Sequence, residues 1–261
     1  MNQQASGLGE ASWQRGLLRT RGFFVAEALI GAPEVARLAS EVSVALELGP
    51  SFVDRDGTRR AVALLEHSDT ALQLLDHDPF WDAVTGLFES ELVLSRADGV
   101  FVSRKADWRI DFEHVKRAVA GRQFRPGLTL FAPVGADANV EVEVMRASHL
   151  LPADAGGKPP ALEPLSVTVP AGAVLVLEAG TWYRAAAVNS FFLSFALVRP
   201  WLKPDIWLSS ALDPQRLNRL GRRGRTLCGA DVGLPTSVEQ FLAIEEASLG
   251  PSMGRQKGSG I

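Results

Sequence analysis

The sequence has almost no cysteine, a single tyrosine and no long apolar run. Its one cysteine, Cys228, rules out an internal disulfide framework and any zinc site built from several cysteines. No apolar run approaches the roughly 18 residues that a membrane-spanning helix needs. The opening residues, MNQQASGLGEAS, lack the apolar segment of a secretory signal. We therefore expect a cytoplasmic protein that does not bind membranes.

The net charge of the chain is also small. The chain has 27 Lys and Arg against 30 Asp and Glu, a formal net charge of −3, which gives no electrostatic reason to expect nucleic acid as a partner. The one dense basic cluster is short and is interpreted as a solvated loop; it consists of Arg219, Arg222, Arg223 and Arg225. With 46% apolar residues, the chain can bury a large core. The expected partner is a small-molecule substrate or ligand.

Both ends of the chain are predicted to be mainly helical. GFFVAEAL is a candidate first strand, and GAPEVARLASEVSVALELG predicts a helix that begins near Pro33 and ends at Gly49-Pro50. DTALQLLDHDPFWDAVTGLF predicts further helical segments, broken near Pro79. After Pro204, DPQRLNRLGRR and TSVEQFLAIEEASL predict a C-terminal helical extension.

The middle of the chain, from about residue 92 to 200, changes to short strands. ELVLSRADGVFVSRK is interpreted as two strands around a turn at Asp98-Gly99. NVEVEV alternates valine with acidic residues in the period of a half-buried strand. LSVTVPAGAVLVLEAG predicts two strands joined at Pro170-Ala171-Gly172, and GLTLFAPVG and FFLSFALV predict two more. Strands at this spacing, punctuated by Gly and Pro, predict a jelly-roll sandwich or barrel.

Five segments, taken in order along the chain, carry a resemblance to a known family. They are RGFFVAEALIGAPEVARLASEV, MRASHLLP, PAGAVLVLEAGTWYRAA, FALVRPWLKP and GLPTSVEQFLAIE. Together they resemble the phytanoyl-CoA dioxygenase family of iron(II)- and 2-oxoglutarate-dependent oxygenases, which has Pro-Gly-Ser-His at the second segment and AGD…TWHR at the third. The resemblance implies a mainly β double-stranded β-helix, a jelly roll of the cupin type, with flanking N- and C-terminal helices.

We expect the whole chain, residues 1–261, to form one domain. Its parts would be an N-terminal helical region at about 20–90, the β-helix core at about 92–200 and a C-terminal helical extension at about 205–248. No repeat is visible, and no linker is long enough to divide the chain.

The resemblance also places the family's iron site on this sequence. The family holds iron with His-x-Asp on one strand and a distant His on a later strand. The first His corresponds to Arg109, the Asp to Asp111 and the distal His to Tyr183, the only tyrosine in the chain. The arginine that clamps 2-oxoglutarate corresponds to Ser190 or Phe191. The sequence thus departs from the family pattern at three of these four positions.

These departures oppose iron. Arginine keeps its proton and offers no lone pair, and tyrosine ligates only as a phenolate, although its ordinary pKa is about 10. Without the clamp arginine, the 2-oxoglutarate carboxylate loses its bidentate partner. On a strand, His114 would face away from Asp111, and His149 corresponds to a structural histidine of the family. We therefore predict no bound metal and no cofactor.

Arg109, Asp111 and Tyr183 are predicted to meet at the mouth of the barrel and to form a metal-independent catalytic site. Arg109 would stabilise a developing negative charge, Asp111 would act as general base and Tyr183 as general acid. This chemistry suits a biosynthetic isomerase, dehydratase or cyclase acting on a small, largely apolar metabolite. The predicted substrate-binding residues are Trp108, Phe131 and Glu113.

Other interpretations stay open. Arg109 and Asp111 could simply neutralise each other as the relic of an old site, and Arg109 would lower the pKa of Asp111 and weaken it as a base. The competing class is a non-catalytic pseudo-oxygenase that binds a small molecule or a protein partner. A third reading is an authentic iron and 2-oxoglutarate hydroxylase with unusual ligands. The sequence does not indicate the substrate, the reaction type or the oligomeric state.

Overall fold

The structure is a computed structural model, which describes residues 3–54, 57–85, 87, 92–112, 126–135, 139–151, 158–186, 188–200, 202, 204–205 and 208–232. Its strands are β1 (Phe23–Ala26), β2 (Ser51–Val53), β3 (Arg59–Ala61), β4 (Val93–Val102), β5 (Arg109–Ile110), β6 (Gly127–Pro133), β7 (Asn139–Val144), β8 (Leu165–Pro170), β9 (Val174–Glu178), β10 (Trp182–Ala185) and β11 (Ser190–Val198). Its helices are α1 (Gln3–Arg21), α2 (Ala32–Leu48), α3 (Leu64–His67), α4 (Asp69–Leu74), α5 (Asp78–Thr85), the short 3-10 helix Ser148–Leu150, α7 (Leu208–Ala211), α8 (Pro214–Asn218) and α9 (Arg222–Leu227).

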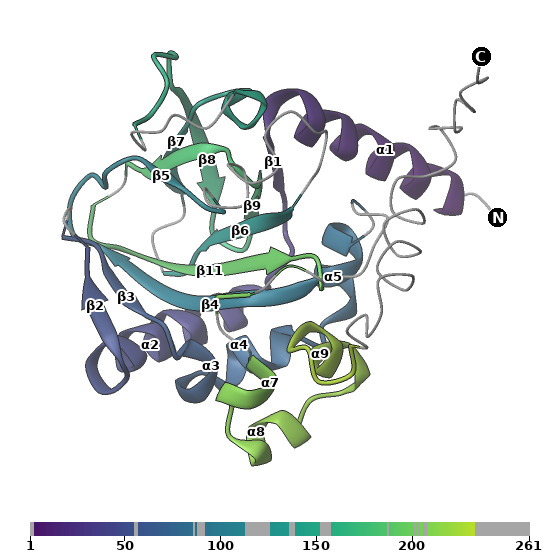
Figure 1. Cartoon of the computed structure of the whole chain (residues 1–261), viewed down its shortest axis with the longest axis vertical. Helices are drawn as coiled ribbons and strands as arrows, with labels where there is room; N and C mark the ends of the chain where they lie inside the picture. The colour runs from purple at the N-terminus through teal and green to yellow at the C-terminus, as the bar shows by residue number, and fades with distance from the viewer. Residues whose placement is uncertain are drawn as a thin grey trace, which may run out of the picture.

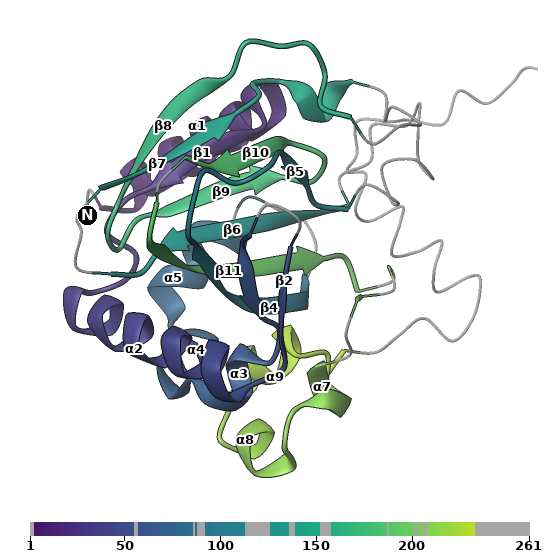
Figure 2. The ribbon, with the colours of Figure 1, turned by 90° about the vertical axis from the view of Figure 1, so that its left-hand side faces the viewer.

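The strands form two facing antiparallel sheets (Figure 1). The larger sheet has the order β1-β9-β6-β11-β4-β3-β2, and the smaller has the order β5-β10-β7-β8. Helices α2, α3 and α4 lie on the side of the larger sheet away from the smaller one in both views (Figures 1 and 2). This confirms the predicted mainly β double-stranded β-helix with flanking helices.

The larger sheet is buried on both faces, which explains its continuous apolar strands. In β11, Phe192 packs between the two sheets, whereas Leu193 and Phe195 pack toward the helices. The helix side includes Trp81 and Phe80, both almost fully buried. An almost entirely apolar strand such as FFLSFALV is therefore required here, because alternate side chains enter two different cores.

Asp98-Gly99 is not a turn, and this prediction was wrong. Both residues lie inside β4, a ten-residue strand that pairs with β11 from Val93 to Val102, with one shift in register at Ser95. A Cβ at position 99 would approach Val42 Cγ1 to 3.0 Å and Leu64 Cδ1 to 3.3 Å. Glycine is present because α2 and α3 pack closely against the strand, and Asp98 points to the opposite face. A glycine needed for close packing was mistaken for a turn glycine.

Gly99→Val should therefore destabilise the fold by about 1–3 kcal/mol, as overpacking of a closed core does. Valine favours strands, so the loss would come from the contact with Val42 and not from backbone preference. Gly135→Val is the control, since a Cβ at Gly135 has nothing within 4 Å. Urea unfolding of both variants measures the difference; equal midpoints would contradict the packing explanation.

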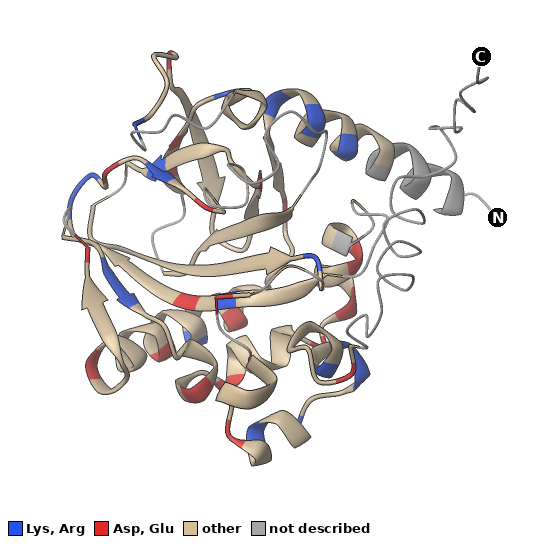
Figure 3. Cartoon of the chain, in the orientation of Figure 1, with Lys and Arg blue, Asp and Glu red and all other residues tan. Residues whose placement is uncertain are grey.

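The N-terminal region contains more than helices and one strand. β2 and β3 form a hairpin that extends the edge of the larger sheet beside β4. Helix α1, which precedes β1, was also not predicted. The predicted helix TSVEQFLAIEEASL lies outside the described residues. Both basic and acidic residues occur on the helices below the larger sheet (Figure 3). Among the helices of the described chain, none is both long and apolar enough to cross a bilayer.

Candidate functional site

A cavity of about 390 Å³ opens where edge strand β5 of the smaller sheet faces the β4-β3-β2 end of the larger sheet. Its wall is rich in charged side chains. The charged lining residues are Asp54, Arg60, Arg96, Asp98, Asp107, Arg109 and Asp111. The apolar lining residues are Phe52, Val62, Trp108 and Ile110. Arginines and carboxylates are thus concentrated where the two sheets meet.

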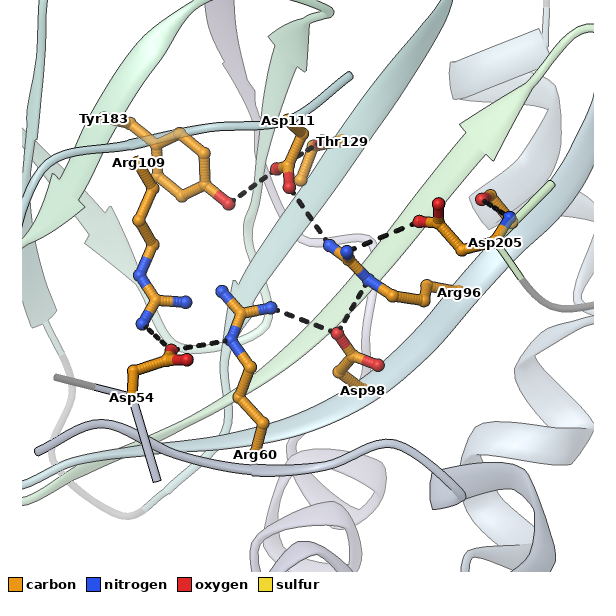
Figure 4. Close-up of polar contacts among 10 residues, drawn as sticks. Asp54, Arg60, Arg96, Asp98, Arg109, Asp111, Thr129, Tyr183 and Asp205 are labelled. Carbon is orange, nitrogen blue, oxygen red and sulfur yellow. Dashed lines mark hydrogen bonds and ion pairs between the residues drawn. The ribbon is translucent and has the colours of Figure 1, made fainter. Parts of the chain in front are cut away.

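Strand β4 supplies the centre of this wall. Arg96 and Asp98 are two residues apart and therefore project from the same face of the strand. Arg96 Nε lies 3.0 Å from Asp98 Oδ2, Nη2 donates to Asp111 Oδ1 at 3.0 Å, and Nη1 lies 3.5 Å from Asp205 Oδ2. Figure 4 shows this guanidinium between three carboxylates. One arginine therefore joins β4, the end of β5 and the segment after β11.

Asp111 follows β5 directly, where the chain turns at Phe112. Phe112 has a φ of 62°, which is uncommon for a residue with a side chain, and its ring is buried against Val93 and Val198. The buried ring and the backbone bond from Gly180 N to Asp111 O fix the carboxylate in place. Local packing at the end of β5 thus determines where Asp111 points.

Both oxygens of Asp111 are already hydrogen-bonded. Thr129 Oγ1 and the Tyr183 hydroxyl each donate to Oδ2 at 2.8 Å, and Arg96 donates to Oδ1. Tyr183 lies opposite Arg109 in the β5–β10 pair, so the hydroxyl reaches diagonally to Asp111. The predicted meeting of Asp111 and Tyr183 is therefore present.

Arg109 is held by a partner that the sequence did not indicate. Its Nη2 donates to Asp54 Oδ2, and the same oxygen accepts a hydrogen bond from Arg60 Nε at 3.2 Å. Arg60 continues the chain of contacts through Nη1, which donates to Asp98 Oδ2 at 3.1 Å. Arg109 thus pairs with Asp54, and Asp111 with Arg96, in place of the mutual neutralisation considered as an alternative, and Arg60 and Asp98 connect the two pairs (Figure 4).

The predicted substrate-binding residues have different positions. Trp108 lines the cavity, with the Arg184 guanidinium 4.3 Å from its ring centroid. Phe131 is buried between the sheets, stacked on Phe192 and edge-on to Tyr183, and is not among the described residues of the cavity wall. Phe131 therefore packs against the Tyr183 ring between the two sheets. Glu113 lies outside the described residues.

The pKa values of Asp98 and Asp111 are shifted in opposite directions. Burial raises the pKa of Asp98 above its usual value, outweighing the opposing effect of Arg96 and Arg60. Burial also acts on Asp111, but Arg96, Arg60 and the hydrogen bonds from Tyr183 and Thr129 outweigh it and hold the pKa below its usual value. Burial, and then Asp111, raise the pKa of Tyr183 well above its usual value. Tyr183 is therefore a neutral donor, and Asp111 an ionised acceptor, at neutral pH.

Sequence reasoning missed Asp54, Arg60, Arg96 and Asp98. A signal was present for two of them, because Arg96-Ala97-Asp98 interrupts an apolar strand with charges at a spacing of two. Charges on the inward face of a strand need partners, so such a pair indicates a polar site. For Asp54 and Arg60 the signal was SFVDRDGTRRA, where Asp-Gly stands between two short strands.

Solved enzymes share this fold. The non-heme alpha-ketoglutarate-dependent epimerase SnoN from nogalamycin biosynthesis matches with a TM-score of 0.60 and 19% identity, over 74% of this chain and 84% of its own. The carbocyclase SnoK from the same biosynthesis matches with a TM-score of 0.58 and 13% identity, over 77% and 90%. EctD from S. alaskensis in its apo form matches with a TM-score of 0.60 and 16% identity, over 74% and 80%.

These identities show the fold alone. No family model matches the sequence, and no curated protein matches it. The chain therefore has the fold of non-heme, alpha-ketoglutarate-dependent enzymes, including biosynthetic ones. The narrower resemblance to the phytanoyl-CoA dioxygenase family stays a prediction.

The described residues do not fit the iron that this fold implies. Iron is present in one SnoN structure, together with alpha-ketoglutarate. In the part of this chain that the structure describes, no group of three or more His, Cys, Asp or Glu side chains is placed to hold a metal ion. Asp111 already accepts three hydrogen bonds, and Arg96 and Arg109 place positive charge at the cavity wall. A guanidinium repels a divalent cation and cannot ligate it.

Proposed function

We propose that the protein is a biosynthetic enzyme of the oxygenase fold that uses neither iron nor 2-oxoglutarate. It would move a proton on a small, largely apolar metabolite, as an isomerase, dehydratase or cyclase does. The observation that carries this proposal is the hydrogen bonding of Asp111, whose oxygens are occupied by Arg96, Thr129 and Tyr183. A carboxylate bound in this way supports ion pairing at the site in place of metal ligation.

Charge stabilisation is assigned to the arginines of the cavity wall. Arg109 and Arg60 both donate to Asp54 Oδ2, so the N–H groups of two guanidinium groups converge on one point at the cavity. An enolate-like oxygen or a carboxylate at that point would accept hydrogen bonds from both. Donors already directed at developing charge lower the barrier because they need no rearrangement during the reaction.

Proton transfer is assigned to Asp98. Asp111 is a weak base, because its pKa is lowered and its oxygens are occupied. Asp98 has a raised pKa and lines the cavity, and its Oδ1 has no hydrogen-bond partner among the described residues. In this proposal Asp98 is the general acid, the residue that carries the proton and releases it to the substrate. Asp111 and Tyr183 are positioning residues, which hold the Arg96 guanidinium beside Asp98.

A second candidate is a non-catalytic protein that binds a small molecule in the same cavity. The observation in its favour is that the network is largely paired within itself, from Arg109 through Asp54, Arg60 and Asp98 to Arg96. A mutually satisfied network stabilises one arrangement of the wall and does not require chemistry.

The test is a search for turnover in D₂O. The protein is incubated with a metabolite extract of its source organism in the presence of EDTA and without oxygen, and mass spectrometry follows each metabolite. The proposal expects one metabolite to be converted, or to gain deuterium, at an undiminished rate under these conditions. Conversion only with added Fe(II), 2-oxoglutarate and oxygen would refute it. Retention of one metabolite without any conversion would instead establish the second candidate.

A further inference from the structure

Asp54 occupies the point where the donors of two arginines converge. One oxygen, Oδ2, accepts from both Arg109 Nη2 and Arg60 Nε. Both arginines line the cavity, and so does Asp54. Two guanidinium groups directed at one carboxylate form the type of contact that proteins use to bind carboxylate ligands.

Asp54 is also more exposed than the two arginines that it binds. Its side chain is 30% exposed, against 10% for Arg60 and 16% for Arg109. It follows the three-residue strand β2, and its backbone N–H donates to Thr58 O at 2.8 Å within the hairpin. Asp98 and Asp111, in contrast, project from β4 and from the end of β5 and are 1% and 13% exposed. Asp54 can therefore leave its arginines with less rearrangement than either of the other two carboxylates.

The charges of the wall define what can replace Asp54. Asp54 is the carboxylate that Arg60 and Arg109 share at the cavity. Asp107 also lines the cavity, but its side chain is exposed to solvent. If Asp54 turns outward into water, one ligand carboxylate can take its place beside the two arginines and restore the negative charge that it removed. A second ligand carboxylate would add a negative charge beyond the one that Asp54 supplied, which is costly in an enclosed site.

The rest of the wall is apolar and partly flat. Phe52, Val62, Trp108 and Ile110 line the same cavity as the arginine pair. The Trp108 ring is held by Arg184, whose guanidinium is ion-paired with Glu143. A ligand that neutralises Arg60 and Arg109 would thus place its remaining atoms against aromatic and aliphatic side chains.

We propose that Asp54 is a displaceable internal carboxylate, which holds the arginine pair ready for a ligand carrying one carboxylate on a flat, apolar body. This inference rests on the proposed function, because it names the substrate class of the same cavity. In the free protein Asp54 competes with the ligand, so the apparent affinity is reduced by the fraction of molecules in which Asp54 is bound.

The experiment measures the binding of a probe to three forms of the full chain. The probe is indole-3-acetate, and indole-3-acetamide is its neutral counterpart. Asp54→Asn should bind indole-3-acetate about tenfold or more tightly than the wild type, because the competing carboxylate is gone. Asp54→Asn combined with Arg109→Gln should lose that gain. Isothermal titration calorimetry gives the affinities, and circular dichroism with thermal melting verifies that each form is folded.

Asp82→Asn is the matched control for net charge. It also removes one negative charge, but it lies on α5, is 66% exposed and pairs with Arg223 outside the cavity wall. Its affinity for the probe should stay within about twofold of the wild type, since distant surface charges are screened. The inference is overturned if Asp54→Asn binds indole-3-acetate no better than the wild type, or if the amide binds as well as the acid.

The result of this binding experiment can be distinguished from the result of the turnover experiment that tests the proposed function. Turnover that requires iron would refute the metal-independent enzyme, yet it would leave the affinity gain of Asp54→Asn as it is. Metal-independent turnover with no gain in Asp54→Asn would refute only the role of Asp54.

Discussion

Arg96→Met should lower the free energy of unfolding by about 3–5 kcal/mol at pH 7, which is the usual cost of removing one partner from a buried ion pair. The reason is that Arg96 is held between Asp98, Asp111 and Asp205, of which Asp98 is almost fully enclosed. Methionine is similar in length and apolar, so the loss of charge pairing would dominate over the loss of volume. Urea unfolding followed by circular dichroism measures the effect.

The pH dependence of the loss distinguishes charge from packing. In the wild type the pKa of Asp111 is lowered, so its contribution to stability is present above the unfolded pKa and is lost as the pH falls through the folded pKa. Without Arg96, ionised Asp98 and Asp111 oppose folding, and their pKa values should rise. The deficit of Arg96→Met should therefore be largest at neutral pH and should shrink toward pH 5. A deficit of constant size would show that packing is the cause.

Two further variants calibrate this result. Arg223→Met removes an arginine that pairs with Asp78 and Asp82 at the surface, and it should cost less than about 1 kcal/mol. Arg96→Lys keeps the charge but cannot direct separate N–H groups at three carboxylates, so its stability should lie between those of Arg96→Met and the wild type. If Arg223→Met lowers the free energy of unfolding as much as Arg96→Met does, the enclosed ion pairs contribute no more to stability than surface ones.

The fold could be predicted from the sequence because the residues that indicate each strand or turn are neighbours in the chain. β7 alternates valine with acidic residues, and β8 and β9 are separated by a turn at Gly172, whose φ is +80°. Each signal is contained in a few neighbouring residues, so no knowledge of the tertiary fold was needed. The misread turn at Asp98-Gly99 shows the limit of this reasoning. The need for glycine at position 99 comes from Val42 and Leu64, which are distant in sequence.

The candidate site could be predicted only in part, for the same reason. Asp111 and Tyr183 meet because strand register places β5 beside β10, and the family resemblance conveyed that pairing. The partners that determine the chemistry come from elsewhere. Arg109 reaches Asp54 across 55 positions of the sequence, and Arg60 reaches Asp98 across 38. Such contacts depend on the β2–β3 hairpin joining the edge of the larger sheet, and strands of three residues give a weak sequence signal.

Asp98→Asn should reduce turnover of the metabolite found in the D₂O search by about 10²–10⁴-fold, the usual contribution of one positioned acid or base. Asparagine keeps the shape of the side chain and can still accept a hydrogen bond from Arg60, but it cannot release a proton. The loss should appear in kcat, while KM changes little, because substrate is bound by Arg60 and Arg109. Thermal melting shows whether the variant is folded at the assay temperature.

The pH profile identifies the proton carrier. Because burial raises the pKa of Asp98, the wild-type rate should be high below this pKa and should fall as the pH rises through it. Asp98→Asn should lack that fall. Tyr183→Phe is the matched comparison, since it removes only the hydroxyl that donates to Asp111. Its turnover should drop about tenfold, far less than that of Asp98→Asn, because a lost positioning contact costs roughly 1–2 kcal/mol. If Tyr183→Phe loses more activity than Asp98→Asn and removes the fall in the profile, Tyr183 is the acid, and the buried β4 aspartate serves only to pair Arg60 with Arg96.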